Sequence, residues 1–189
     1  EQNLCRNIAL EGIKRLREGE TRNREISSED LRIIMSWACG TGLDGSYLEM
    51  LREELAPENQ DLRAPDWNKE ELAPNRDFTV AIIGAGMSGI LAAYRLKQAG
   101  VDFVIFEKNT AIGGTWLENT YPGCRVDVSN HVYCYSFMQK HDWPHFHSTQ
   151  AVLLKYFNDC ADEFDIRDQI RFSTEVSSAV WDEDNGIWA

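Results

Sequence analysis

Three glycines and one acid have the spacing needed to hold the phosphates and a ribose of a nucleotide. Gly84, Gly86 and Gly89 form a Gly-x-Gly-x-x-Gly run, and Glu107 closes the next apolar stretch. A glycine loop lets phosphate oxygens reach backbone N–H groups, because no Cβ stands between them. The Glu107 carboxylate can accept both ribose hydroxyl protons and would repel a 2′-phosphate, so the pattern favours FAD or NAD over NADP.

These residues need a strand, a helix and a second strand to bring them together. Residues 79–83 are apolar and β-branched, residues 87–98 have a helical apolar period, and residues 101–106 form a second apolar run. The order predicts a βαβ unit in a parallel sheet, and hence an α/β fold. Glycine turns also arise by chance, but here small residues, Ala93 and Gly100, occupy the matching helix positions, which favours the nucleotide interpretation.

A long segment without helical period, residues 109–137, follows the acid. A simple NAD domain returns to a helix sooner, and long ordered loops in compact domains are often functional. Gly113 and Gly114 can approach a cofactor closely, and Trp116 can cover a flat ring system. The alternative is a surface loop with buried aromatic side chains.

The motifs of this region resemble the FAD domain of Baeyer–Villiger monooxygenases. The matching residues are Gly84-x-Gly86-x-Ser88-Gly89, Phe106-Glu107-Lys108, Gly113-Gly114-Thr115-Trp116, Asn119-x-Tyr121-Pro122-Gly123, Asp127 and Tyr133-x-Tyr135-Ser136-Phe137. The resemblance covers residues 78–189. Within the family, the N-terminal extension and the wording Tyr-Pro-Gly-Cys-Arg-Val-Asp are most similar to 4-hydroxyacetophenone monooxygenases. Residues 117–120 differ from the Tyr-Trp-Asn-Arg of many members.

The resemblance implies a Rossmann-like FAD-binding domain with a βαβ unit and the start of a β-meander. It also implies an enzyme that uses FAD, NADPH and dioxygen to insert oxygen into a ketone, giving an ester or lactone, with aryl ketones such as 4-hydroxyacetophenone as candidate substrates. Two alternatives stay open. One is a flavin monooxygenase that oxidises nitrogen or sulfur, and the other is a non-catalytic FAD-binding or oligomerisation module.

The resemblance assigns roles to the matching residues. Facing the pyrophosphate would be Gly84, Gly86, Ser88 and Gly89. Glu107 would bind the adenosine ribose, Lys108 the adenine edge, and Val176 would lie near the adenine end. The phosphate and flavin would be lined by Gly114, Thr115 and Trp116, with Asp127 and Tyr133 near the isoalloxazine.

Asp127 is the candidate catalytic residue, because in the resembling enzymes this acid orients an arginine beside the flavin. Arg125 is a candidate contact for the nicotinamide cofactor. The alternative for this pair is a local ion pair that closes the loop. A metal site is not favoured: three of the four histidines lie within residues 141–147, but their spacing suits an extended surface segment.

The chain of 189 residues carries 31 acidic and 19 basic side chains, a net charge of −12. Without a basic stripe, binding to nucleic acid or to an anionic membrane is disfavoured. Five cysteines, an odd number without a C-x-x-C pair, favour a reducing cytoplasm over a disulfide framework. No apolar run is long enough to span a membrane.

The chain is expected to contain three parts: a helical extension over residues 1–55, a proline-containing linker over residues 56–77, and an incomplete FAD-binding domain over residues 78–189. The extension is predicted to hold three amphipathic helices. Leu4, Ile8, Ile13 and Leu16 mark the first, and Tyr47, Leu48, Leu51 and Leu55 the third. Ser28 is the expected cap of the second helix, which Gly40 would close. Such short amphipathic helices need a partner surface, which could be the FAD-binding domain, each other or another subunit, and they are candidates for homodimer contacts.

Beyond the loop, Ser148 or Thr149 is expected to cap a helix that runs to about Phe164. Strands are predicted over residues 169–172 and 175–181, and Asn185-Gly186 predicts a hairpin turn. The return strand would have only three residues, and the sequence lacks a second glycine fingerprint for NADPH. We therefore expect a fragment of a longer enzyme that is inactive alone.

Overall fold

The computed structural model describes residues 2–18, 27–39, 44–55 and 61–189. The chain divides into two compact units, Glu1–Met50 and Leu51–Ala189. The first unit holds helices α1 (Gln2–Arg17), α2 (Ser28–Cys39) and the start of α3 (Gly45–Leu55). The three helices predicted for the extension are confirmed.

Side-chain oxygens cap the second and third helices. The Ser27 hydroxyl accepts a hydrogen bond from the backbone N–H of Asp30 at 3.0 Å, and Asp44 accepts one from Tyr47 at 2.9 Å. The prediction that Ser28 is the cap was wrong by one position, because Ser28 already has a helical backbone. Gly40 and the side chains of Leu4, Ile8, Leu16 and Leu55 lie outside the described residues.

Several apolar side chains of the first unit face solvent. Leu31, Met35 and Leu48 are buried. Side chains that remain 42–55% exposed are Leu10, Ile13, Ile33, Ile34, Tyr47 and Met50. The described helices of the first unit therefore carry both buried and exposed apolar side chains.

The second unit is built on a parallel sheet with the order β1-β2-β3. The strands are β1 (Thr79–Ile83), β2 (Asp102–Phe106) and β3 (Ile170–Arg171), which confirms the strands predicted at these places. β1 pairs with β2 in the register Ile82 to Ile105, and β2 pairs with β3 through Ile105 and Ile170. Helix α5 (Met87–Gln98) connects β1 to β2 and packs against both, which completes the predicted βαβ unit.

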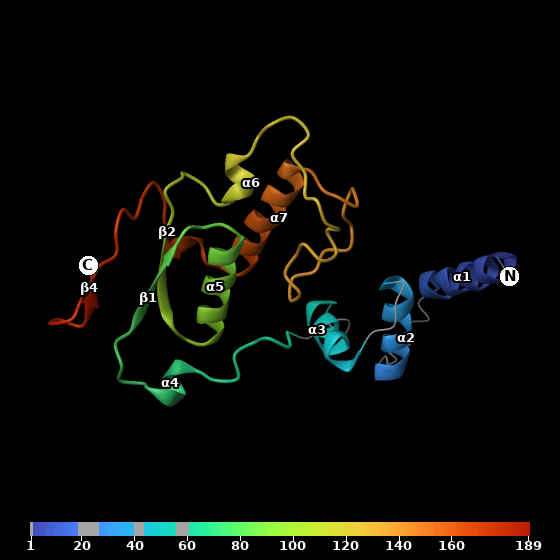
Figure 1. The fold of residues 1–189 in the computed structure, drawn as a ribbon, viewed down its shortest axis with the longest axis horizontal. Coiled ribbons are helices and arrows are strands. Elements are labelled where there is room, and N and C mark those ends of the chain that lie inside the picture. Colours follow the sequence, from blue (N-terminus) through green and yellow to red (C-terminus); the bar gives the residue numbers. More distant parts are fainter. Residues whose placement is uncertain (1, 19–26, 40–43, 56–60) are drawn as a thin grey trace. The chain divides into compact units, whose positions relative to one another are not determined.

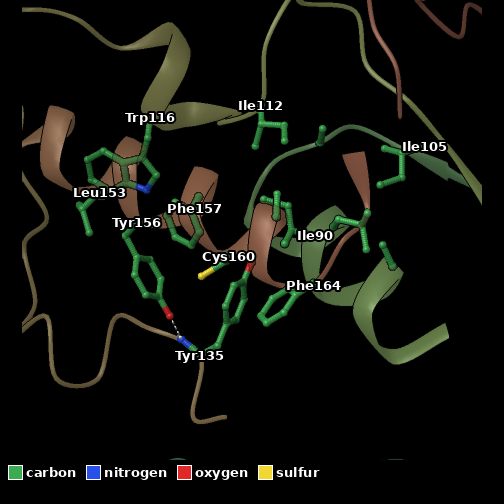
Figure 2. Packing of buried hydrophobic residues seen from close by; sticks show 14 of the residues in the cluster. Ile90, Ile105, Ile112, Trp116, Tyr135, Leu153, Tyr156, Phe157, Cys160 and Phe164 are labelled. Carbon is green, nitrogen blue, oxygen red and sulfur yellow. Dashed lines mark hydrogen bonds between the residues drawn. The ribbon is translucent and has the colours of Figure 1, made fainter. Parts of the chain in front are cut away.

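Helix α7 (Gln150–Glu163) contacts α5 and supplies much of the core, as Figure 1 shows. Thr149 precedes it as predicted, but its side chain makes no capping hydrogen bond. The buried side chains include Ile90 of α5, Ile105 of β2, and Leu153 and Phe157 of α7 (Figure 2). Burying each such side chain contributes about 1.5–3 kcal/mol.

The remaining elements are short. They are α4 (Lys69–Leu72), α6 (Thr115–Glu118), the 3-10 turn η1 (Arg167–Gln169), and the hairpin strands β4 (Trp181–Asp182) and β5 (Ile187–Trp188). The hairpin turn at Asn185-Gly186 is confirmed, with Gly186 at a φ of +64°. The strand predicted over residues 175–181 was wrong for most of its length, because within the described chain residues 175–179 pair with no strand.

The segment 61–77, predicted as part of a linker, is attached to α5. Asp61 receives two hydrogen bonds from the Arg95 guanidinium, at 2.5 and 2.8 Å, and a third from Gln98 at 3.1 Å. Burial alone would raise the pKa of Asp61, but these hydrogen bonds outweigh it and the pKa is lowered. Asn68 caps α4 by accepting from the Glu70 N–H at 2.9 Å.

Within the described residues, no helix is both long and apolar enough to cross a membrane.

Candidate nucleotide-binding site

The glycine loop after β1 has the backbone shape that the sequence predicts. Gly84 has a φ of +94°, in the left-handed region that favours glycine. A Cβ at Gly89 would lie 1.9 Å from the carbonyl oxygen of Gly84, so a side chain there would force the loop away from α5. The loop can thus stay against the N-terminus of α5 only with glycine at this position.

A second glycine loop lies against the first. The backbone N–H of Gly113 donates to the carbonyl oxygen of Ala85 at 3.1 Å. A Cβ at Gly114 would lie 2.9 Å from the Cα of Gly86, so the two backbones approach too closely for a side chain. Gly114 itself has a φ of +53°. The expectation that Gly113 and Gly114 approach a cofactor stays a prediction; the structure shows that they approach the first glycine loop.

Glu107 directly follows β2 and is 3% exposed. Its carboxylate accepts hydrogen bonds from the backbone N–H of Ala85 at 2.6 Å and of Asn109 at 2.8 Å. These bonds fix the carboxylate at the carboxyl end of β2. Each oxygen of a carboxylate can accept more than one hydrogen bond, so capacity for ribose hydroxyls remains.

The two loops and Glu107 border a cavity of about 290 Å³, close to the lower end of the range for ligand pockets. Its lining residues are Ile83, Gly84, Gly86, Phe106, Glu107, Lys108, Asn109, Gly114, Glu118, Thr174, Glu175 and Val176. The cavity is continuous from the glycine loops to Val176. This arrangement fits a phosphate group at the glycines and a ribose beside Glu107.

The cavity brings together six of the residues predicted for the cofactor site: Gly84, Gly86, Glu107, Lys108, Gly114 and Val176. Gly89 supports the loop from behind. Outside the lining are Ser88, Thr115, Trp116, Arg125, Asp127 and Tyr133. The roles proposed for these six residues stay predictions.

Trp116 is only 7% exposed and belongs to the hydrophobic core (Figure 2). Its indole N–H donates to the Tyr133 hydroxyl at 3.1 Å, and the two rings meet edge to face with centroids 5.7 Å apart. Tyr133 in turn borders a separate cavity that also contains Arg95 and Phe137. Trp116 thus ties the second glycine loop to the aromatic core.

Arg125 and Asp127 lie on a loop and are both exposed. The Arg125 guanidinium donates to the His147 carbonyl at 3.1 Å, while among the described ion pairs none joins Arg125 to Asp127. The loop is held at its base by Asn130, which is fully buried. Asn130 donates to Ser148 Oγ at 2.7 Å and accepts from the Ser148 N–H at 2.9 Å. Ser148, a predicted helix cap, instead serves this loop.

Sequence reasoning missed four polar or charged lining residues: Asn109, Glu118, Thr174 and Glu175. It also missed the ion pair between Glu118 and Lys108. Asn109 could have been found as the residue after the motif Phe106-Glu107-Lys108. Thr174 could not, because it reaches the site through a hydrogen bond from its N–H to the Glu107 carbonyl at 2.9 Å, which depends on β3 pairing with β2.

No group of three or more His, Cys, Asp or Glu side chains with the geometry of a metal site occurs in the described ranges. Cys124, Cys134 and Cys160 are free thiols, while Cys5 and Cys39 have side chains outside the described residues. Burial raises the pKa of the Cys160 thiol to about 12, so this thiol stays protonated at neutral pH.

Residues 82–148 match the family model described as an NAD(P)-binding Rossmann-like domain. This match covers the end of β1, the glycine loop, α5, β2 and the buried acid Glu107. The chain contains a Rossmann-like domain.

The Rossmann-like domain is similar to parts of known monooxygenases. The FAD-binding monooxygenase moxY of Dothistroma septosporum is 40% identical over 134 residues, which are 70% of this chain and 20% of that protein. A Baeyer–Villiger monooxygenase of Streptomyces coelicolor is 42% identical over 110 residues, covering 58% of this chain and 21% of that protein. The chain therefore spans about a fifth of the length of these curated relatives.

A solved structure gives the same relation. The oxidised steroid monooxygenase bound to NADP superposes with a TM-score of 0.56 at 39% sequence identity, covering 59% of this chain and 23% of that chain. The Rossmann-like domain of this chain is thus related to the FAD-binding and Baeyer–Villiger monooxygenases in sequence and in fold.

Proposed function

We propose that this chain is the FAD-binding part of an NADPH-dependent flavoprotein monooxygenase that inserts an oxygen atom into a ketone. The observation that best supports this proposal is that Ala85 of the first glycine loop is hydrogen-bonded to both other parts of the site. Its N–H donates to the Glu107 carboxylate at 2.6 Å, and its carbonyl accepts from the Gly113 N–H at 3.1 Å. The names of the relatives support the same proposal, since they include FAD-binding and Baeyer–Villiger monooxygenases.

In this proposal the residues of the chain bind and orient the cofactor. The backbones of Gly84, Gly86 and Gly114 accommodate the diphosphate, and Glu107 accepts hydrogen bonds from the adenosine ribose. Ser88 and Thr115 stand next to the two loops and extend the phosphate contacts. FAD held by these residues would supply the redox chemistry, with NADPH as the hydride donor and dioxygen as the oxygen source.

Asp127 is proposed to act near the flavin. It is exposed and, within the described part of the chain, its side chain forms no hydrogen bond or ion pair, so it is available to orient a cationic partner. Arg125, whose guanidinium has one hydrogen bond to the His147 carbonyl, is proposed to contact the nicotinamide cofactor. Val176 is proposed to face the adenine, and it lines the same cavity as Glu107.

The substrate class that we propose is an aryl ketone such as 4-hydroxyacetophenone, converted to the corresponding ester. Its basis is the similarity of the extension and of residues 121–127 to the enzymes of that name. We also propose that the chain by itself binds FAD without oxygenating a ketone, and that the protein works in the cytoplasm, where thiols such as Cys124 and Cys134 stay reduced.

A titration of the purified chain with FAD tests the central proposal. We expect the flavin fluorescence to change on binding, and the absorption spectrum to shift as the isoalloxazine leaves water. NADP alone should compete poorly with FAD, because Glu107 repels a 2′-phosphate. If the chain binds NAD with higher affinity than FAD, the flavoprotein proposal is wrong. Product analysis of the full-length protein with a ketone and a thioether then separates oxygen insertion from sulfur oxidation.

The N-terminal helices are proposed to form a homodimer. Their exposed apolar side chains, including Ile33 and Ile34 at 53% and 54%, lie on adjacent positions of α2. Sedimentation equilibrium should find a dimer for the complete chain and a monomer for the double variant Ile33→Ser, Ile34→Ser. A monomeric wild-type chain at concentrations of about 100 μM would contradict the proposal.

A further inference from the structure

A second acid, Glu118, lies at the rim of the nucleotide cavity. It is the last residue of α6, and its Oε1 lies 2.9 Å from the Lys108 ammonium nitrogen. The same oxygen accepts a hydrogen bond from the Asn109 side chain at 3.0 Å. Glu118 therefore holds the two residues that follow Glu107 in the chain.

Lys108 is the one positively charged side chain among the described residues that line the cavity, whereas Glu107, Glu118 and Glu175 are acidic. The hydrogen bond to Glu118 raises the pKa of Lys108. The hydrogen bond from Asn109, followed by that from Lys108, lowers the pKa of Glu118. At neutral pH both partners are charged, so the ammonium group is already paired.

The location of this pair relates it to one atom of a bound nucleotide. A ribose that donates its hydroxyls to Glu107 has its 2′-oxygen beside the residues next to Glu107, which are Lys108 and Asn109. A free lysine at this position would give a 2′-phosphate a charge-assisted hydrogen bond. With Glu118 in place, that ammonium group is occupied and a further negative charge is present.

We propose that Glu118 is a specificity-determining residue that keeps 2′-phosphorylated nucleotides out of this cavity by engaging Lys108. The inference rests on the proposed function of the cavity. It adds a discriminating element to the repulsion by Glu107, and it places that element on α6, a different segment of the chain.

The ion pair between Lys108 and Glu118 should affect ligand binding more than the stability of the fold. The side chains of Lys108 and Glu118 are 58% and 43% exposed. Ion pairs that are this exposed contribute little to folding, so removal of Glu118 should leave the domain folded. By contrast, the loss of the Glu118 charge should change the affinity for a 2′-phosphate, which would lie close to this pair.

The test compares two ligands that differ only in the 2′-phosphate, ADP-ribose and 2′-phospho-ADP-ribose, by isothermal titration calorimetry on the complete chain. The quantity measured is the ratio of their dissociation constants. In Glu118→Gln we expect this ratio to move about tenfold in favour of the 2′-phosphorylated ligand, as removal of one nearby charge predicts. The dissociation constant of ADP-ribose itself should change little.

Two further variants make the assignment specific. Adding Lys108→Met to Glu118→Gln should return the ratio toward the wild-type value, because the freed ammonium group is then missing. Glu71→Gln, which removes the same charge from an exposed position of α4 outside the cavity, should leave the ratio at the wild-type value.

An unchanged ratio in Glu118→Gln overturns the inference, and so does an equal change in Glu71→Gln. If the ratio stays shifted toward the 2′-phosphorylated ligand after Lys108→Met is added, the role assigned to Lys108 is wrong. If the wild-type chain binds neither ADP-ribose nor FAD, the proposed nucleotide site itself is wrong, which is a distinct result.

Discussion

The carboxylate of Glu107 and the backbone N–H of Ala85 are joined by a hydrogen bond of 2.6 Å, although the two residues belong to different strand ends. The second oxygen of Glu107 accepts from the N–H of Asn109 at 2.8 Å. Glu107, which is proposed to bind a ribose, therefore also links the glycine loop to the end of β2. Its substitution should affect folding and binding together.

We expect Glu107→Gln to lower the free energy of unfolding by about 1–3 kcal/mol. In the wild type the two carboxylate oxygens accept from the N–H groups of Ala85 and Asn109, and in the variant the amide NH₂ would leave one of these N–H groups without an acceptor. Chemical denaturation monitored by circular dichroism measures this loss. FAD affinity should fall in the same variant. Glu175→Gln changes an exposed acid that also lines the cavity, and as the matched control it should keep wild-type stability. Equal stability of both variants would contradict the structural role of Glu107.

We expect Gly89→Ala to abolish FAD binding and to destabilise the second unit by about 1–3 kcal/mol. A Cβ at this position would lie 1.9 Å from the Gly84 carbonyl oxygen, which is backbone and has no rotamer to move. Thermal denaturation and flavin titration measure the two effects.

Gly12→Ala is the control for Gly89→Ala. Gly12 lies within α1 and a Cβ there meets no atom within 4 Å. Alanine should stabilise that helix by up to about 1 kcal/mol and leave FAD binding intact. If Gly89→Ala binds FAD like the wild type, the close packing of the loop on α5 is not needed for the site.

Asp127→Ala in the full-length protein should reduce ketone oxygenation strongly while the flavin content per protein stays unchanged. Asp127 is exposed and its removal should change stability by no more than about 0.5 kcal/mol. Turnover with a ketone, normalised to bound flavin, measures the effect. Wild-type turnover would remove Asp127 from the mechanism, and loss of flavin would instead make it a binding residue.

The Asp61–Arg95 pair should make the stability of the second unit dependent on acid pH. The pKa of Asp61 is lowered in the folded state, so its stabilisation is complete above the ordinary aspartate pKa of 3.8 and is lost as pH falls below that value. Asp61→Asn should cost about 1–2 kcal/mol at pH 7 and less near pH 3. Urea denaturation at both pH values measures the difference, and an equal cost at the two would contradict the assignment.

The βαβ unit could be predicted because its determinants are local. Gly84 has a positive φ and Gly89 has no room for a Cβ, and the apolar runs around them have the periods of a strand and a helix. The turn at Asn185-Gly186 was predictable for the same reason. In each case a few adjacent residues specify the backbone.

The rim of the site depends on contacts between distant residues, which a single sequence does not reveal. Glu118 meets Lys108 across ten positions, and Thr174 reaches Glu107 only because β3 pairs with β2. Of the two predicted caps, Thr149 takes the N-cap position of α7, whereas the Ser148 hydroxyl accepts a hydrogen bond from Asn130, 18 positions earlier. The stretch 175–179 has strand propensity, but a strand also needs a neighbour to pair with.

Three segments that are separated in the sequence are connected by hydrogen bonds: the loop at Ala85, the end of β2 at Glu107 and the loop at Gly113. Gly113 donates to Ala85, and Glu107 accepts from Ala85 and Asn109. Their backbone amides are therefore aligned by bonds within the protein, and little chain has to lose conformational freedom when a ligand arrives. Association should thus be a single fast step, without a slow ordering phase in stopped-flow traces. Calorimetry should find a heat-capacity change no larger than the buried ligand surface requires.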